Sequence, residues 1–201
     1  MNKHERREHI IECSKNLFVR KGFHNTTVSD IIEESRIARS TFYAHFPSRM
    51  VIFQELVDRY SAILLDVILG INITRASGEQ PLSAQIRDMT VPLTAAIEQN
   101  RDLTLLLITA PLGHDDAFDR SVSDFFTVIL AAIKRLLLEG MEGGTIHAFN
   151  ADIISYMILG SVKQILLQWL VYGDIGDITT PLDDIIEYTL FGIAARTYSH
   201  A

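Results

Sequence analysis

The stretch GFHNTTVSDIIEESRIARSTFYAHF, residues 22–46, decides the fold because it holds two short helical segments joined by a tight turn. Thr27 stands before the first segment, where its hydroxyl can accept from free backbone N–H groups, and Asp30 takes the reciprocal capping position three residues later. In the second segment, helical spacing puts Phe42 and Phe46 on an inner face. We therefore expect two helices that pack across a turn.

A further helix precedes this stretch. Within REHIIECSKNLFVRKG, residues 7–22, Gly22 can take the left-handed conformation that closes a helix, and Phe23 can fold back apolar surface. The apolar residues of this helix recur at helical spacing: Ile10, Ile11, Cys13, Leu17 and Phe18. Because Cys13 lies on that face, we expect a buried cysteine that acts as a small hydrophobe, and no disulfide framework.

The outer face of the third helix is polar. It carries Arg39, Ser40, Thr41, Tyr43 and His45. Such side chains can donate hydrogen bonds to base edges and phosphates, as a helix lying in the major groove of DNA requires. Ser48 then stands as the cap of a long fourth helix, and Arg49 at its start can hold another phosphate.

From about Arg7 to Phe53 the chain resembles the DNA-binding domain of the TetR/AcrR family of transcriptional regulators. The resemblance rests on ordered landmarks: LF at 17–18, GF at 22–23, TT at 26–27, DI at 30–31, TFYAHF at 41–46 and a basic residue at position 49. It implies that Thr27, Tyr43, His45 and Arg49 contact phosphates. It also implies that Arg39, Ser40 and Thr41 approach base edges.

Two residues depart from the family pattern. Arg36 stands in the turn where the family usually has Gly, and a non-Gly residue in a left-handed turn costs on the order of 1 kcal/mol. Either the turn is strained or its backbone differs. Ala38 replaces the usual Ser cap and forfeits roughly 1 kcal/mol. Arg36 lies next to the expected DNA face, where it is either an extra phosphate contact or a solvated side chain.

Charge is divided unevenly along the chain. Residues 1–60 hold ten Lys or Arg against eight Asp or Glu, and the remaining 141 residues hold eight against seventeen, within a net charge of −7. A mildly basic amino-terminal module on an acidic body directs DNA to one end. The apolar run at 153–172 is as long as a membrane span, but Lys163, Gln164 and Gln168 interrupt it. We expect a cytoplasmic protein without a signal peptide or a membrane span.

Beyond residue 49 the pattern is helical throughout, so we predict an all-α fold of about nine helices. The expected domains are a three-helix helix-turn-helix domain, 1–48, and a larger ligand-binding and dimerisation domain, 49–201. We predict that the fourth helix runs from Ser48 to about Ile73 and that Pro92 kinks the fifth. Asn150 is expected to cap the eighth helix. Thr180 is expected to cap the ninth, which would end near Tyr198.

The last two helices, about 151–172 and 181–198, carry wide apolar faces. Two from each of two chains can bury these faces as a four-helix bundle, and the family resemblance implies the same homodimer. Two-fold symmetry then predicts a palindromic operator in double-stranded DNA. The resemblance also implies a pocket for a small-molecule effector in the larger domain. Residues that could line the pocket or equally form ordinary core are Tyr60, Met89, Phe125, Phe126, Tyr156, Gln164 and Trp169.

The sequence offers no set of nucleophile, base and orienting acid, and no glycine-rich phosphate loop, so we predict neither an enzyme nor a cofactor. The Asp cluster after His114 is better explained as a helix start than as a metal site. The favoured function is a repressor released by its effector. Two alternatives stay open: an activator of the same architecture, and a helical ligand-binding scaffold without operator recognition.

Overall fold

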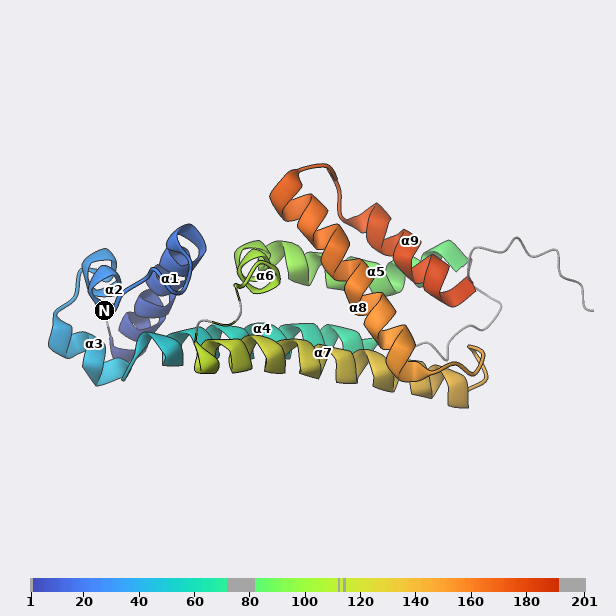
Figure 1. The fold of residues 1–201 in the computed structure, drawn as a ribbon, viewed down its shortest axis with the longest axis horizontal. Coiled ribbons are helices and arrows are strands. Elements are labelled where there is room, and N and C mark those ends of the chain that lie inside the picture. Colours follow the sequence, from blue (N-terminus) through green and yellow to red (C-terminus); the bar gives the residue numbers. More distant parts are fainter. Residues whose placement is uncertain (1, 72–81, 112, 114, 192–201) are drawn as a thin grey trace, which may run out of the picture. The chain divides into compact units, whose positions relative to one another are not determined.

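The computed structural model describes residues 2–71, 82–111, 113 and 115–191, and these form an all-α fold (Figure 1). The predicted fold class is confirmed: the described part holds nine α-helices and one π-helical segment. In chain order they are α1 (Lys3–Lys21), α2 (Val28–Ser35), α3 (Arg39–His45), α4 (Arg49–Gly70), α5 (Leu82–Gln99), α6 (Arg101–Ile108), α7 (Asp116–Glu142), α8 (Ala151–Leu167), η2 (Gln168–Tyr172) and α9 (Thr179–Phe191).

The chain divides into two compact units. Unit 1 comprises Met1–Ile63 and Asn100–Thr127, and unit 2 comprises Leu64–Gln99 and Val128–Ala201. The helices α4 and α7 each contribute residues to both units. The predicted domain boundary at residue 48 stays a prediction.

In unit 1, α1 presents one buried face. Ile10, Ile11, Leu17 and Phe18 are at most 3% exposed, as the sequence predicts. The prediction for Cys13 is wrong, since its side chain is only half-buried and Ser14 takes the core position. Ser14 tolerates that position because its hydroxyl donates to the carbonyl oxygen of Ile10 at 2.7 Å.

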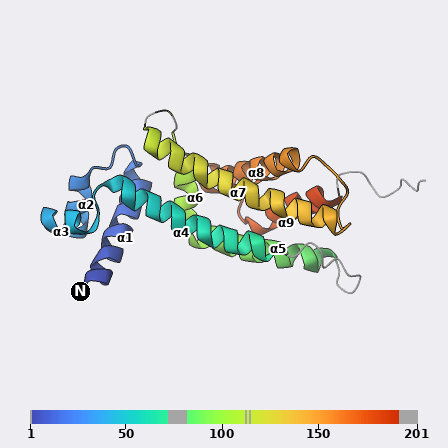
Figure 2. The ribbon, with the colours of Figure 1, turned by 90° about the horizontal axis from the view of Figure 1, so that it is seen from below.

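Unit 1 also contains the first halves of α4 and α7, which run side by side in the same direction (Figures 1 and 2). The rings of Phe53 and Phe118 lie 4.7 Å apart between centroids, and those of Tyr60 and Phe125 lie 5.6 Å apart. In both pairs the α4 residue and the α7 residue are separated by the same number of positions along the chain. The two helices therefore keep a constant register over two turns.

Unit 2 is built around α5, α8 and α9. The buried Thr90 of α5 donates its hydroxyl to the carboxylate of Asp183 on α9, and Lys134 of α7 pairs with Asp152 of α8 at 2.6 Å. Pro92 lies inside α5 as predicted. The Asn150 side chain accepts from the backbone N–H groups of Asp152 and Ile153, which confirms the predicted cap of α8.

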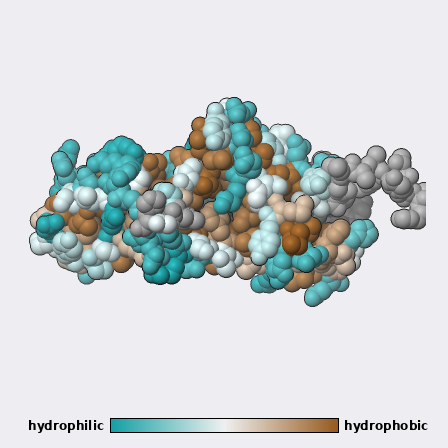
Figure 3. Space-filling view, viewed as in Figure 1, coloured by the Kyte–Doolittle hydropathy of each residue, from teal (hydrophilic) through white to brown (hydrophobic). Residues whose placement is uncertain are grey.

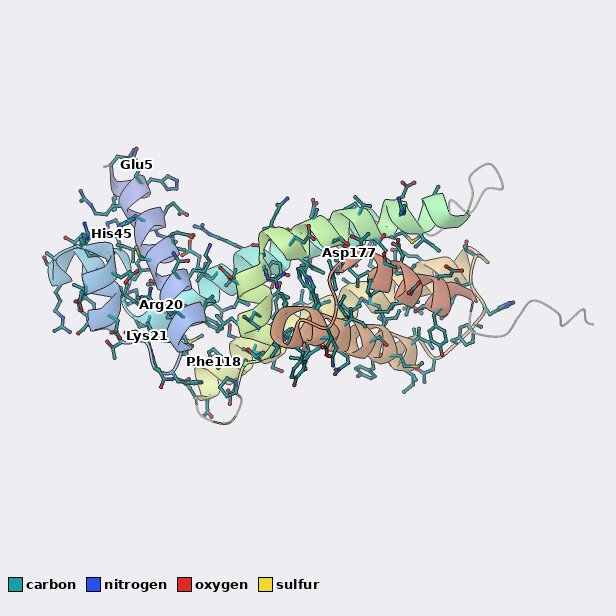
Figure 4. The ribbon with its side chains drawn as sticks, turned by 90° about the horizontal axis from the view of Figure 1, so that it is seen from above. Glu5, Arg20, Lys21, His45, Phe118 and Asp177 are labelled. Atoms are coloured by element: carbon teal, nitrogen blue, oxygen red, sulfur yellow. The ribbon has the colours of Figure 1, made fainter. Side chains whose placement is uncertain are left out.

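Two predicted helix boundaries are wrong, whereas the predicted range of the eighth helix, 151–172, is confirmed by α8 and η2 together. The fourth helix begins at Arg49 but already ends at Gly70. The ninth begins at Thr179, and Asp177 rather than Thr180 supplies its cap (Figure 4). The Asp177 carboxylate accepts from the N–H groups of Thr179 and Thr180, and these bonds lower the pKa of Asp177. The last turn predicted for the eighth helix is π-helical. The predicted end near Tyr198 lies outside the described residues.

The helix α8 leaves apolar side chains on the surface of unit 2 (Figure 3). Ile153, Tyr156 and Met157 are 53%, 59% and 49% exposed, and Tyr188 of α9 is 47% exposed. By length and composition, Ala151–Tyr172 could also cross a membrane, and 17% of that stretch is buried. The described residues of unit 2 leave these apolar side chains uncovered.

Candidate DNA-binding interface

The start of α2 is fixed by a complete capping box, as predicted. The Thr27 hydroxyl accepts from the backbone N–H of Asp30 at 3.1 Å, and the Asp30 carboxylate accepts from the backbone N–H of Thr27 at 2.7 Å. Lys21 adds an ion pair with Asp30 at 2.8 Å. The Lys21 bond, followed by the two Thr27 bonds, holds the pKa of Asp30 well below its usual range. The box holds Thr27 at the corner where α1 turns into α2.

The turn between α2 and α3 is strained at Arg36. This residue has φ 51° and ψ 45°, and it is the one non-Gly residue with positive φ in the part of the chain that the structure describes. Of the two alternatives for this turn, the left-handed one is therefore correct. The backbone N–H of Arg36 closes α2 on the carbonyls of Ile32 and Glu33. The strain is the cost of an arginine where glycine would fit freely.

The helix α3 separates an inner and an outer face, as its spacing predicts. Phe42 and Phe46 are fully buried, whereas Tyr43 is 51% exposed. Arg39 and Ser40 are exposed, and Thr41 and His45 are half-buried. Ala38 makes no side-chain cap to the helix. The Ala38 carbonyl instead accepts from the backbone N–H groups of Thr41 at 2.9 Å and Phe42 at 3.2 Å, so the helix begins without a side-chain cap.

Positive charge is available at the turn and largely neutralised elsewhere in unit 1. Among the described residues, no acidic side chain pairs with Arg36 or Arg39. Other cations of α1 and α4 are engaged: Arg7 with Glu55, Lys15 with Glu12, Arg20 with Glu34, Lys21 with Asp30, and Arg59 with Glu8. The Arg36 and Arg39 guanidinium groups therefore lie unpaired where the sequence predicts the DNA face, and mild net charge matters less than placement.

Arg49 has a structural role that sequence reasoning missed. Its Nη1 donates to the backbone carbonyls of Phe23 at 2.6 Å, His24 at 3.2 Å and Thr26, and its guanidinium lies 4.4 Å from the Phe23 ring centroid. The arginine thus ties the start of α4 to the loop between α1 and α2. A phosphate contact by Arg49 stays a prediction.

The predicted ligand residues fall in both units. Tyr60, Phe125 and Phe126 belong to unit 1, and Met89, Tyr156, Gln164 and Trp169 belong to unit 2. The structure brings Tyr60 and Phe125 into a stacked pair, and burial raises the pKa of Tyr60 to about 12. Its hydroxyl lies 2.6 Å from that of Thr104.

Exposure differs among the predicted ligand residues of unit 2. Trp169 is buried, whereas Tyr156 and Gln164 lie on the exposed side of α8. A pocket lined by the predicted set stays a prediction.

Residues 10–56 match the family described as bacterial regulatory proteins, tetR family. The chain is 26% identical over 116 residues to YuxN of Bacillus subtilis, an uncharacterized HTH-type transcriptional regulator, covering 58% of this chain and 39% of YuxN. It is 28% identical over 181 residues to YerO of the same organism, also uncharacterized, covering 85% of this chain and 58% of YerO. The matches thus span well under two thirds of these relatives.

Solved structures share the fold over nearly the whole chain. The fatty acid degradation regulator FadR of Bacillus halodurans aligns with a TM-score of 0.77 at 17% identity, covering 95% of this chain and 97% of that one. FadR of Bacillus subtilis in complex with stearoyl-CoA gives 0.71 at 16%, covering 93% and 99%. FadR of Thermus thermophilus in complex with lauroyl-CoA gives 0.63 at 20%, covering 97% and 98%.

The matched residues 10–56 include α2, the strained turn and α3, and the capping box, the buried phenylalanines and the polar outer face all lie within them. The fold around them is that of solved transcriptional regulators. Residues 10–56 thus carry the helix-turn-helix of the tetR family of bacterial regulatory proteins, and the chain is similar to HTH-type transcriptional regulators.

Proposed function

We propose that the protein is a homodimeric repressor that binds a palindromic operator in the cytoplasm and is released by a small-molecule effector. The outer face of α3 carries this proposal. Tyr43 is exposed above the buried Phe42, and the unpaired guanidinium groups of Arg36 and Arg39 flank the start of the helix. Exposed cations and a tyrosine on a rigid helix suit phosphate and base contacts in the major groove.

In this proposal the DNA phosphates are contacted by Thr27, Arg36, Tyr43, His45 and Arg49. The base edges are contacted by Arg39, Ser40 and Thr41. Two observations favour a phosphate contact by Arg36. Its backbone is strained, and its side chain forms no ion pair with any described residue. Strain of this kind is common where a side chain has a binding role. A neutral substitution of Arg36 should therefore weaken DNA binding.

The exposed apolar side of α8 supports the homodimer. Ile153, Tyr156, Met157 and Gly160 follow each other at helical spacing and are all exposed. A second copy related by two-fold symmetry would cover this face with the same residues of its own α8 and with α9. The dimer would place two α3 helices about 34–36 Å apart, or a multiple of that distance, along the operator.

Long-chain acyl-CoA is the first effector to test. Two regulators of this fold are seen with stearoyl-CoA and lauroyl-CoA. The buried Tyr60–Phe125 pair is an apolar surface that an acyl chain could contact, with the Tyr60 hydroxyl as a polar anchor. Effector binding would favour a conformation in which the two α3 helices no longer match the operator.

Selection of bound sequences from random duplex DNA tests the core of the proposal. We expect a palindrome from the wild-type protein and none from Tyr43→Ala, which leaves the fold intact because the ring is exposed. An absence of enrichment at moderate salt would instead favour a scaffold without operator recognition. A reporter placed behind the selected operator separates a repressor, which lowers expression, from an activator.

The effector is tested on the complex of wild-type protein and selected operator. Stearoyl-CoA or lauroyl-CoA should release the DNA, whereas free coenzyme A at the same concentration should not. Equal occupancy with and without either acyl-CoA would exclude this ligand class.

A further inference from the structure

The ring of Phe118, near the start of α7, is buried against the loop that joins α1 to α2 (Figure 4). It stacks on Phe23 of that loop, with centroids 4.7 Å apart and planes 19° apart. The His24 ring meets the Phe118 ring edge-on at 4.8 Å. Phe118 also packs on Phe53 of α4. One side chain of α7 therefore touches two consecutive residues of the loop.

The start of α7 is itself held in place. The Asp115 carboxylate accepts from the backbone N–H groups of Ala117 at 2.9 Å and Phe118 at 3.1 Å, and these bonds lower the pKa of Asp115. Electrostatic interactions with His24 and Arg49 lower the pKa of Asp115 further. The backbone that carries Phe118 is thus fixed beside the loop by a helix cap and by charge.

The loop, residues 22–27, leads directly to the capping box of α2. Thr26 donates its hydroxyl to the carbonyl of Gly22 at 2.8 Å, and Arg49 donates to the carbonyls of Phe23, His24 and Thr26. Gly22 itself differs from the prediction: its φ of 80° is positive, but its ψ of 154° is extended, so the chain leaves α1 straight into this loop. The position of the loop therefore sets the position of Thr27.

We infer that Phe118 is a positioning residue for DNA binding: by packing on Phe23 and His24, it makes α7 a direct support of the α1–α2 loop and hence of Thr27. This inference rests on the proposed function. It adds a second support to the one that α4 provides through Arg49. The Phe118 ring itself lies in the core, 1% exposed, and acts through the loop backbone.

The chain offers a control at Val122, one turn later on α7. Its side chain is buried, at 3% exposure, and it belongs neither to the predicted DNA contacts nor to the predicted effector contacts. Val122→Ala removes apolar core volume from the same helix. The comparison therefore separates a general loss of core packing from the loss of the aromatic contacts with Phe23 and His24.

The experiment compares Phe118→Leu with Val122→Ala in the full chain, because each change removes only part of a buried apolar side chain and both variants should fold. Three quantities are measured: the urea midpoint, the Kd for a duplex carrying the selected operator, and hydrogen exchange of the Thr26 and Thr27 amides. We expect similar midpoints. We expect Phe118→Leu to raise the Kd about tenfold and to speed exchange of both amides, and Val122→Ala to change the Kd less than about twofold.

An unchanged Kd in folded Phe118→Leu, or equal weakening by both variants, would overturn the inference. Unchanged exchange at Thr26 and Thr27 would overturn it as well, and this measurement needs no DNA. If the wild-type protein itself selects no operator, the proposed function fails, whereas the exchange data still decide whether Phe118 holds the loop.

Discussion

Two helices of this protein expose aromatic side chains to solvent, and they do so with opposite chemistry. On α3, Tyr43 stands beside the cationic Arg39 and above a buried phenylalanine face. On α8, Tyr156 stands between Ile153 and Met157, and all three are about half exposed. An exposed tyrosine therefore does not by itself indicate what kind of partner its surface binds. Its neighbours indicate a phosphate surface on α3 and a protein surface on α8.

The comparison is tested most strongly within α3 itself, where Phe42 and Tyr43 are adjacent. Phe42→Ala removes a fully buried ring and should cost about 3–5 kcal/mol of unfolding free energy. Tyr43→Ala should change that free energy by less than about 0.5 kcal/mol, because the ring is exposed, while it abolishes operator selection. Urea denaturation and DNA binding of both variants separate the two roles. Similar stability losses would mean that the faces of α3 are misassigned.

On α8 the corresponding change is Ile153→Asp. A carboxylate buried at a two-fold interface should weaken the dimer by about 2–4 kcal/mol, and sedimentation should show a monomer at micromolar concentration. Ser123→Asp, which adds the same charge at an exposed site on α7, is the control and should remain a dimer. A dimer that survives Ile153→Asp would place the interface on another surface.

A smaller effect is expected at the turn before α3. Arg36→Gly relieves about 1–2 kcal/mol of left-handed strain but adds about 0.5–1 kcal/mol of unfolded-chain entropy, so stability should rise by about 0.5–1 kcal/mol. DNA binding should weaken at the same time. The slope of log K against log salt concentration should fall by about 1, as expected when one phosphate contact is lost. An unchanged slope would make Arg36 a solvated side chain.

The smallest effect concerns the Asp30 carboxylate in the capping box. Its pKa in the folded protein is lowered by Lys21 and Thr27, so its stabilisation is fully present above the ordinary aspartate pKa of 3.8 and is lost as the pH falls through the folded value. Asp30→Asn should therefore lower the Tm slightly at pH 7, and the difference from wild type should shrink in acid. A pH-independent difference would rule out the ionised carboxylate as the stabilising group.

Sequence patterns predicted the local features of the interface correctly. The capping box at Thr27 and Asp30, the uncapped start at Ala38 and the inner pair Phe42 and Phe46 each depend on residues within four positions of one another. The fold class followed from the same short-range periodicity. For the turn at Arg36, the sequence left two alternatives, a strained left-handed turn or a different backbone.

The amino-acid sequence by itself determined where most helices begin, which faces they bury and which polar side chains α3 presents, because caps and helical periodicity act over three or four residues. Only the tertiary structure decided that Ser14 rather than Cys13 enters the core and that Arg49 binds carbonyls of the α1–α2 loop. It also decided that Phe118 supports that loop and that α8 leaves its apolar side exposed. These features join residues far apart in the chain, whose meeting depends on how whole helices pack.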